Sequence, residues 1–195
     1  MAIFAAERLT GLVAVHAAVV TWRGLALVVP GASGVGKSTL CVAAAAVGAK
    51  VLTDEYALVD AASGQVTGWH RPIRVRRDGG VDRLNLAVSS EPVTVGLVAL
   101  VVHDPVAGSN WTPIAQADAV IGLMNNTVCA RSRPDESLDA ALSIARSARA
   151  VRGTRGEAKS SIVELLAMFD GRHARSAETP QNRSPNDPLA FELNE

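Results

Sequence analysis

The stretch GASGVGKS, residues 31–38, matches the pattern G-x-x-x-x-G-K-[S/T] in full. An apolar run precedes it, and residues 37–47, which contain no helix breaker, follow it. Glycines let the backbone wrap closely around phosphates, while successive N–H groups and the positive end of the next helix attract an anion. The sequence therefore predicts a phosphate-binding loop between a strand and a helix.

The predicted nucleotide contacts cover this stretch and the residue after it. They are Gly31, Ala32, Ser33, Gly34, Val35, Gly36, Lys37, Ser38 and Thr39. Lys37 supplies a mobile positive charge for the β- and γ-phosphates, and the Ser38 hydroxyl supplies one ligand of Mg²⁺. ATP and Mg²⁺ are therefore the expected cofactors, although no base-contacting motif separates ATP from GTP.

Phosphoryl transfer also needs carboxylates, to hold the metal and to accept a proton. Two places in the sequence offer them. Asp54 and Glu55 directly follow a short predicted strand, residues 51–53, and Asp104 follows the apolar run 98–102. We favour the first pair, because adjacent acids at a strand end point in different directions and can serve metal and substrate separately. Asp104 precedes a proline and suits a turn.

Further candidates carry imidazole and guanidinium groups. His16 lies within an apolar strand, where it is either a core or edge histidine or part of the site. His70, Arg71, Arg74 and Arg76 form a basic strip. This strip is either a solvated face or a grip on a phosphate or an anionic substrate group.

The order of these motifs resembles that of a known family. A histidine in the strand before the loop, GASGVGKSTL (residues 31–40) and Thr53-Asp54-Glu55 resemble the catalytic domain of HPr kinase/phosphorylase. GWHRPIRVR (residues 68–76) and Asn126-Thr127-Val128, followed by Arg131, Arg133 and Pro134, look like the short stand-alone HPr kinase-like proteins, some of which accompany lasso peptides. The resemblance covers roughly residues 8–168.

This resemblance implies an ATP-dependent kinase with an acceptor hydroxyl, typically a serine of a peptide or protein. By position, Asp54 would be the general base, and Ser38 and Glu55 would hold Mg²⁺. Lys37 and His16 would belong to the catalytic site, and Arg71 and Arg74 would contact substrate. Members of the family often assemble, which makes a homo-oligomer a further expectation. The family's usual acid pair is Asp-Asp, whereas this chain has Asp-Glu.

Composition bounds the remaining possibilities. The 195 residues are 48% apolar, which suits one domain, residues 1–174, before a proline-rich segment, 175–195, expected to be a disordered tail. Nineteen basic and nineteen acidic side chains cancel, which argues against a nucleic-acid or membrane-surface partner. Two cysteines and no signal-peptide or membrane-span pattern favour a cytoplasmic protein.

We expect an α/β domain of the HPr kinase C-terminal type, with a mixed sheet packed by three or four helices. Strands are predicted over residues 12–20, 25–29, 51–53, 56–59, 66–76 and 93–102, and helices over 37–47, 115–124, 138–150 and 160–169. Two functional alternatives stay open at this point. One is a nucleotide-sensing binding module with little turnover, and the other is a kinase of a small hydroxylated metabolite.

Overall fold

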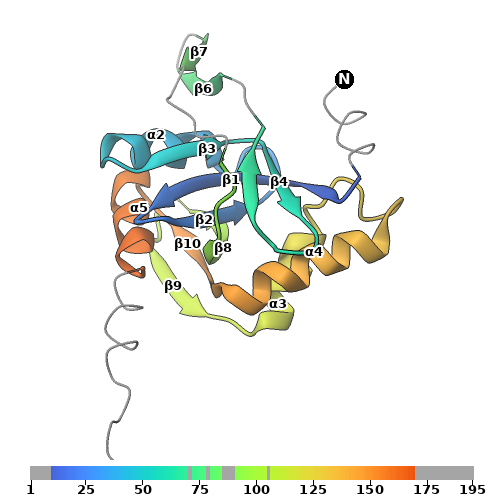
Figure 1. The fold of residues 1–195 in the computed structure, drawn as a ribbon. Coiled ribbons are helices and arrows are strands. Elements are labelled where there is room, and N and C mark those ends of the chain that lie inside the picture. Colours follow the sequence, from blue (N-terminus) through green and yellow to red (C-terminus); the bar gives the residue numbers. More distant parts are fainter. Residues whose placement is uncertain (1–9, 70–71, 78–79, 85–90, 105, 170–195) are drawn as a thin grey trace, which may run out of the picture.

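The computed structural model describes residues 10–69, 72–77, 80–84, 91–104 and 106–169. They form an α/β structure with an open mixed sheet of eight strands and four helices (Figure 1). The strands of this sheet are β1 (Leu12–Trp22), β2 (Leu25–Pro30), β3 (Lys50–Thr53), β4 (Tyr56–Asp60), β5 (Val66–Gly68), β8 (Val95–His103), β9 (Asn110–Pro113) and β10 (Arg149–Arg155). The helices are α2 (Lys37–Ala46), α3 (Gln116–Met124), α4 (Pro134–Ser147) and α5 (Ala158–Ala167). The expected α/β class and mixed sheet are confirmed. The predicted tail, 175–195, lies outside the described residues.

The sheet is built outward from the β1–β2 hairpin. Its turn consists only of Arg23 and Gly24, with φ of 51° and 78°. Two successive positive φ values give a turn whose twist matches that of the paired strands. β1 therefore continues through Trp22, two residues beyond the predicted end.

The strand order in the sheet is β5-β4-β1-β2-β8-β10-β9, with β3 paired to β1. β2, β8 and β10 are parallel neighbours. Since parallel strands end at the same edge of a sheet, the segments after Pro30, His103 and Arg155 lie along one edge. This edge carries the candidate site.

Two hydrophobic cores cover the two faces of the sheet, because successive strand residues point to opposite sides. In β2, Leu27 and Val29 join the core beneath α2 and α5, while Ala26 and Val28 join the core beneath α3 and α4. Figure 1 shows the two helix pairs on opposite sides of the sheet. The core thus fixes α2, which follows the glycine-rich loop, against the face that also carries α5.

One predicted strand, residues 66–76, is wrong, because the chain forms two strands there. β5 ends at Gly68 and pairs with β4, whereas β6 (Ile73–Arg77) pairs with β7 (Gly80–Leu84) in a separate two-stranded sheet. At Gly68, a Cβ would overlap the carbonyl of Leu52. This close approach explains the glycine and marks the point where the chain leaves the main sheet.

The helix predicted over residues 138–150 is also misplaced. α4 begins at Pro134, a residue favoured in the first helical turn, and two acids in that turn complement the helix dipole. It ends at Ser147, and residues 149 and 150 already belong to β10. β7, β9 and β10 were not predicted. β10 is polar by sequence and is held by hydrogen bonds to β8 on one side and β9 on the other.

Candidate functional site

The glycine-rich loop, residues 31–36, connects β2 to α2 at the edge where the parallel strands end. Gly34 and Gly36 have φ of 95° and 86°, a region that other residues rarely adopt. Gly36 is the N-cap of α2, and no side chain caps the helix there. The first N–H groups of α2 are therefore available to an anion. The predicted strand–loop–helix arrangement is confirmed.

Lys37 folds back over this loop. Its Nζ donates hydrogen bonds to the carbonyls of Gly31 at 2.6 Å and Ala32 at 2.8 Å, and only 6% of the residue is exposed. Burial lowers the pKa of the Lys37 amine, and the nearby Asp54 partly opposes this shift. The Lys37 ammonium group, which we expected to contact phosphates, is thus hydrogen-bonded to main-chain oxygens of the loop.

Ser38 and Asp54 are in direct contact. The Ser38 hydroxyl donates to Asp54 Oδ2 at 2.6 Å, and Asp54 is 7% exposed. Asp54 reaches this place because the Thr53 hydroxyl accepts hydrogen bonds from the N–H groups of Glu55 and Tyr56, which turns the chain sharply after β3. A buried carboxylate therefore faces the first turn of α2.

Glu55 and His16 lie beside the start of the loop. The Glu55 carbonyl accepts from the N–H of Ala17, and the His16 carbonyl accepts from the N–H of Gly31 at 3.1 Å. The His16 ring lies 5.7 Å from that of Tyr56. Along β1, His16 shares a face with Ala18 and Val20, which belong to the core beneath α2. The structure thus brings His16 and the acid pair to the same part of the molecule.

Arg155 also belongs to the site, although no sequence motif predicted it. This last residue of β10 is 4% exposed. Its Nε donates to the carbonyl of Val35 at 3.4 Å, and Nη1 donates to the carbonyl of Gly156 at 3.1 Å. A Cβ at Gly36 would overlap its guanidinium. Its only sign in the sequence is a position between two glycines, just before the last helix.

Asp104 lies beside Arg155, because its N–H donates to the Arg155 carbonyl at 3.1 Å, but its carboxylate is held by its own turn. Asp104 Oδ1 accepts from the N–H groups of Val106 and Ala107 at 2.9 and 3.1 Å, which makes it a turn residue. These hydrogen bonds lower the pKa of the exposed Asp104 carboxyl. Arg71 lies outside the described residues. Arg74 belongs to β6, but its side chain is not described.

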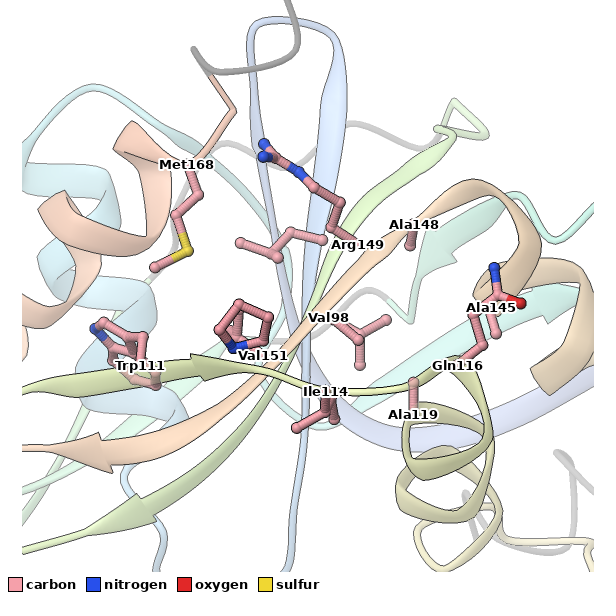
Figure 2. Close-up of a pocket in the computed structure, with 13 residues that line it drawn as sticks. Val98, Trp111, Ile114, Gln116, Ala119, Ala145, Ala148, Arg149, Val151 and Met168 are labelled. Carbon is pink, nitrogen blue, oxygen red and sulfur yellow. The ribbon is translucent and has the colours of Figure 1, made fainter. Parts of the chain in front are cut away.

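An apolar cavity of about 450 Å³ lies away from the glycine-rich loop. Figure 2 shows Trp111 and Met168 at one end of it and Gln116 and Ala145 at the other. Its wall also includes the first three residues of β10, whereas Arg155 lies at the opposite end of that strand. The cavity is therefore separate from the candidate site.

The fold and the site define an α/β protein with a glycine-rich loop, a buried lysine and a serine–carboxylate contact at one sheet edge. No protein-family model matches the chain, and no curated protein matches it. Within the described ranges, no group of three or more His, Cys, Asp or Glu side chains is placed to hold a metal ion. No described helix is long and apolar enough to cross a membrane.

Proposed function

We propose that this chain is an ATP-dependent kinase that transfers the γ-phosphate to a hydroxyl of a peptide or protein. The observation that carries the proposal is the contact between Ser38 and Asp54, directly after the glycine-rich loop. A glycine-rich loop alone suits any nucleotide-binding protein. A buried carboxylate bonded to the serine of that loop adds an acceptor for a proton at the same place.

The loop would bind the triphosphate through its backbone. N–H groups of residues 32–36 and the start of α2 provide donors and the positive end of the helix dipole. Lys37 Nζ now bonds two loop carbonyls, and it would exchange these for β- and γ-phosphate oxygens. That exchange replaces neutral acceptors by charged ones, which form stronger hydrogen bonds with an ammonium group.

The donor set at this place fits Mg²⁺. The Ser38 hydroxyl is a hard oxygen donor in the first turn of α2, and Mg²⁺ prefers such ligands together with phosphate, carboxylate and water. When bound with ATP, the ion would supply positive charge against the oxygens of the transferring phosphate. Glu55, the other expected ligand, follows Asp54 at the same turn.

Asp54 is proposed as the general base. Its Oδ2 already accepts a hydrogen bond from one hydroxyl, that of Ser38, which supports this role. Once Ser38 turns away from it, Oδ2 would accept the proton of the acceptor hydroxyl. The acceptor oxygen then forms a bond to the γ-phosphorus, the bond from this phosphorus to the β–γ bridging oxygen breaks, and ADP leaves.

The serine acceptor rests on the resemblance to HPr kinase-like proteins, whose motif order this chain follows from His16 to the segment 126–134. A basic strip that includes Arg71 and Arg74 would suit an acceptor with an anionic group, such as a peptide carboxyl terminus. We place the reaction in the cytoplasm, which is compatible with two free, buried cysteines.

Transfer of label from γ-labelled Mg·ATP tests this function. The protein would receive a library of peptides ending in serine and, separately, a protein-free cell extract, with Asp54→Asn in parallel. Labelled peptide that disappears with Asp54→Asn is the expected result. Label only in the extract would replace the acceptor by a small metabolite. Binding of ATP without any labelled product would contradict the kinase and favour a nucleotide-sensing module.

A further inference from the structure

Arg155 is a buried cation in an electrostatically unfavourable place. Its guanidinium bonds only main-chain carbonyls, those of Val35 and Gly156, and no carboxylate of the described residues lies within ion-pair distance of it. Burial lowers the pKa of the Arg155 guanidinium, and the exposed Glu157 opposes this shift. A buried charge without an ionised partner costs stability.

The surroundings of Arg155 are positive as well. It packs against Gly36, the N-cap of α2, where the helix dipole places partial positive charge. Lys37, the next residue, carries a second buried cation. The guanidinium and this helix terminus therefore carry charge of the same sign in the free protein. A bound polyanion would reverse the sign of this interaction, because each group then faces negative charge.

The hydrogen bond from Arg155 also orients the loop. Its Nε donates to the carbonyl of Val35. In a trans peptide, the C=O of one residue and the N–H of the next point in opposite directions, and the described chain has no cis peptide bond. A carbonyl of Val35 that points toward Arg155 therefore directs the N–H of Gly36 away from β10. This is the direction that a loop needs if its N–H groups are to converge on an anion.

We propose that Arg155 is a positioning residue for polyphosphate binding: from the end of β10, it fixes the Val35–Gly36 peptide and adds charge behind the loop. The inference rests on the proposed nucleotide site and names its ligand class, a triphosphate chain. It predicts that loss of the guanidinium weakens polyphosphate binding without lowering the stability of the free protein. An arginine that only supports the fold would have the opposite effects.

Isothermal titration with Mg·ATP and with inorganic tripolyphosphate tests this, using the full chain, Arg155→Met and Arg155→Lys. The matched control is Arg152→Met, since the Arg152 side chain lies on the same strand and is 55% exposed. Thermal unfolding of each free protein supplies the second readout. We expect Arg155→Met to raise the Kd of both ligands at least about tenfold with an unchanged or higher Tm, and Arg152→Met to leave Kd unchanged.

A smaller change in Kd for Arg155→Met, or an equal loss in Arg152→Met, would overturn the inference. If Arg155→Met does not fold, Arg155→Lys decides. One ammonium group cannot hold both carbonyls in the geometry of a guanidinium, so weaker binding supports the inference and unchanged binding overturns it. Failure of the proposed function has a different signature. In that case ATP binds and the binding depends on Arg155, but no phosphate is transferred. A wild-type protein that binds neither ATP nor tripolyphosphate would contradict both the proposed function and the role of Arg155.

Discussion

Replacing Asp54 by Asn is the perturbation that separates the two carboxylates offered by the sequence. Asp54 is 7% exposed and accepts a 2.6 Å hydrogen bond from Ser38, whereas the exposed Asp104 carboxylate accepts from two N–H groups of its own turn. Asn keeps an acceptor oxygen in both places but cannot take up a proton at neutral pH. Asp104→Asn is therefore a matched control.

The expected magnitudes follow from these contacts. A hydrogen bond to a charged group contributes about 1.5–3 kcal/mol and a neutral one about 0.5–1.5, so Asp54→Asn should lower the free energy of unfolding by about 1 kcal/mol. Loss of the general base should reduce phosphate transfer by about 10²- to 10⁴-fold. The Kd for Mg·ATP should change by less than about tenfold, because Lys37 and the loop backbone remain.

Single-turnover transfer from γ-labelled ATP, titration calorimetry and urea unfolding would be measured for wild type and both variants. Asp104→Asn should transfer phosphate at the wild-type rate. Transfer by Asp54→Asn within about threefold of wild type, or an equal loss of activity in Asp104→Asn, would contradict the assignment of Asp54 as the base.

Three further predictions concern stability. Because burial lowers the pKa of Lys37, the charged form of this amine costs stability below that pKa. The unfolding free energy of wild type, relative to that of Lys37→Met, should therefore rise as the pH increases toward 10.5. A difference between the two proteins that is independent of pH would contradict this. In Gly153→Ala, the new Cβ would overlap a main-chain carbonyl of β9 and should cost about 1–3 kcal/mol in urea unfolding, whereas Gly108→Ala, which has open space around it, should cost less than about 0.5 kcal/mol. Ile144→Ala, at a fully buried position of α4, should cost about 2–5 kcal/mol, and Leu138→Ala, 43% exposed on the same helix, should lower Tm much less.

Much of the fold near the site was predictable because it depends on neighbours in sequence. The glycines of residues 31–36 break regular structure, and the breaker-free stretch that follows forms α2 within one residue of the predicted end. The acids at 54 and 55 do follow a strand. β10 could not be predicted in this way, since RAVRGTR has no apolar alternation. It becomes a strand only because β8 and β9 supply hydrogen-bond partners on both sides.

Local sequence alone specifies the strand–loop–helix around residues 31–38 and the acid pair at the next strand end. Steric limits on glycine and local helix preference act over a few residues and need no partner. The contact of Asp54 with Ser38 and the contact of Arg155 with Val35, across 120 residues of chain, arise only in the tertiary structure. These contacts depend on strand order, and strand order follows from burial of two opposite faces by segments far apart in sequence.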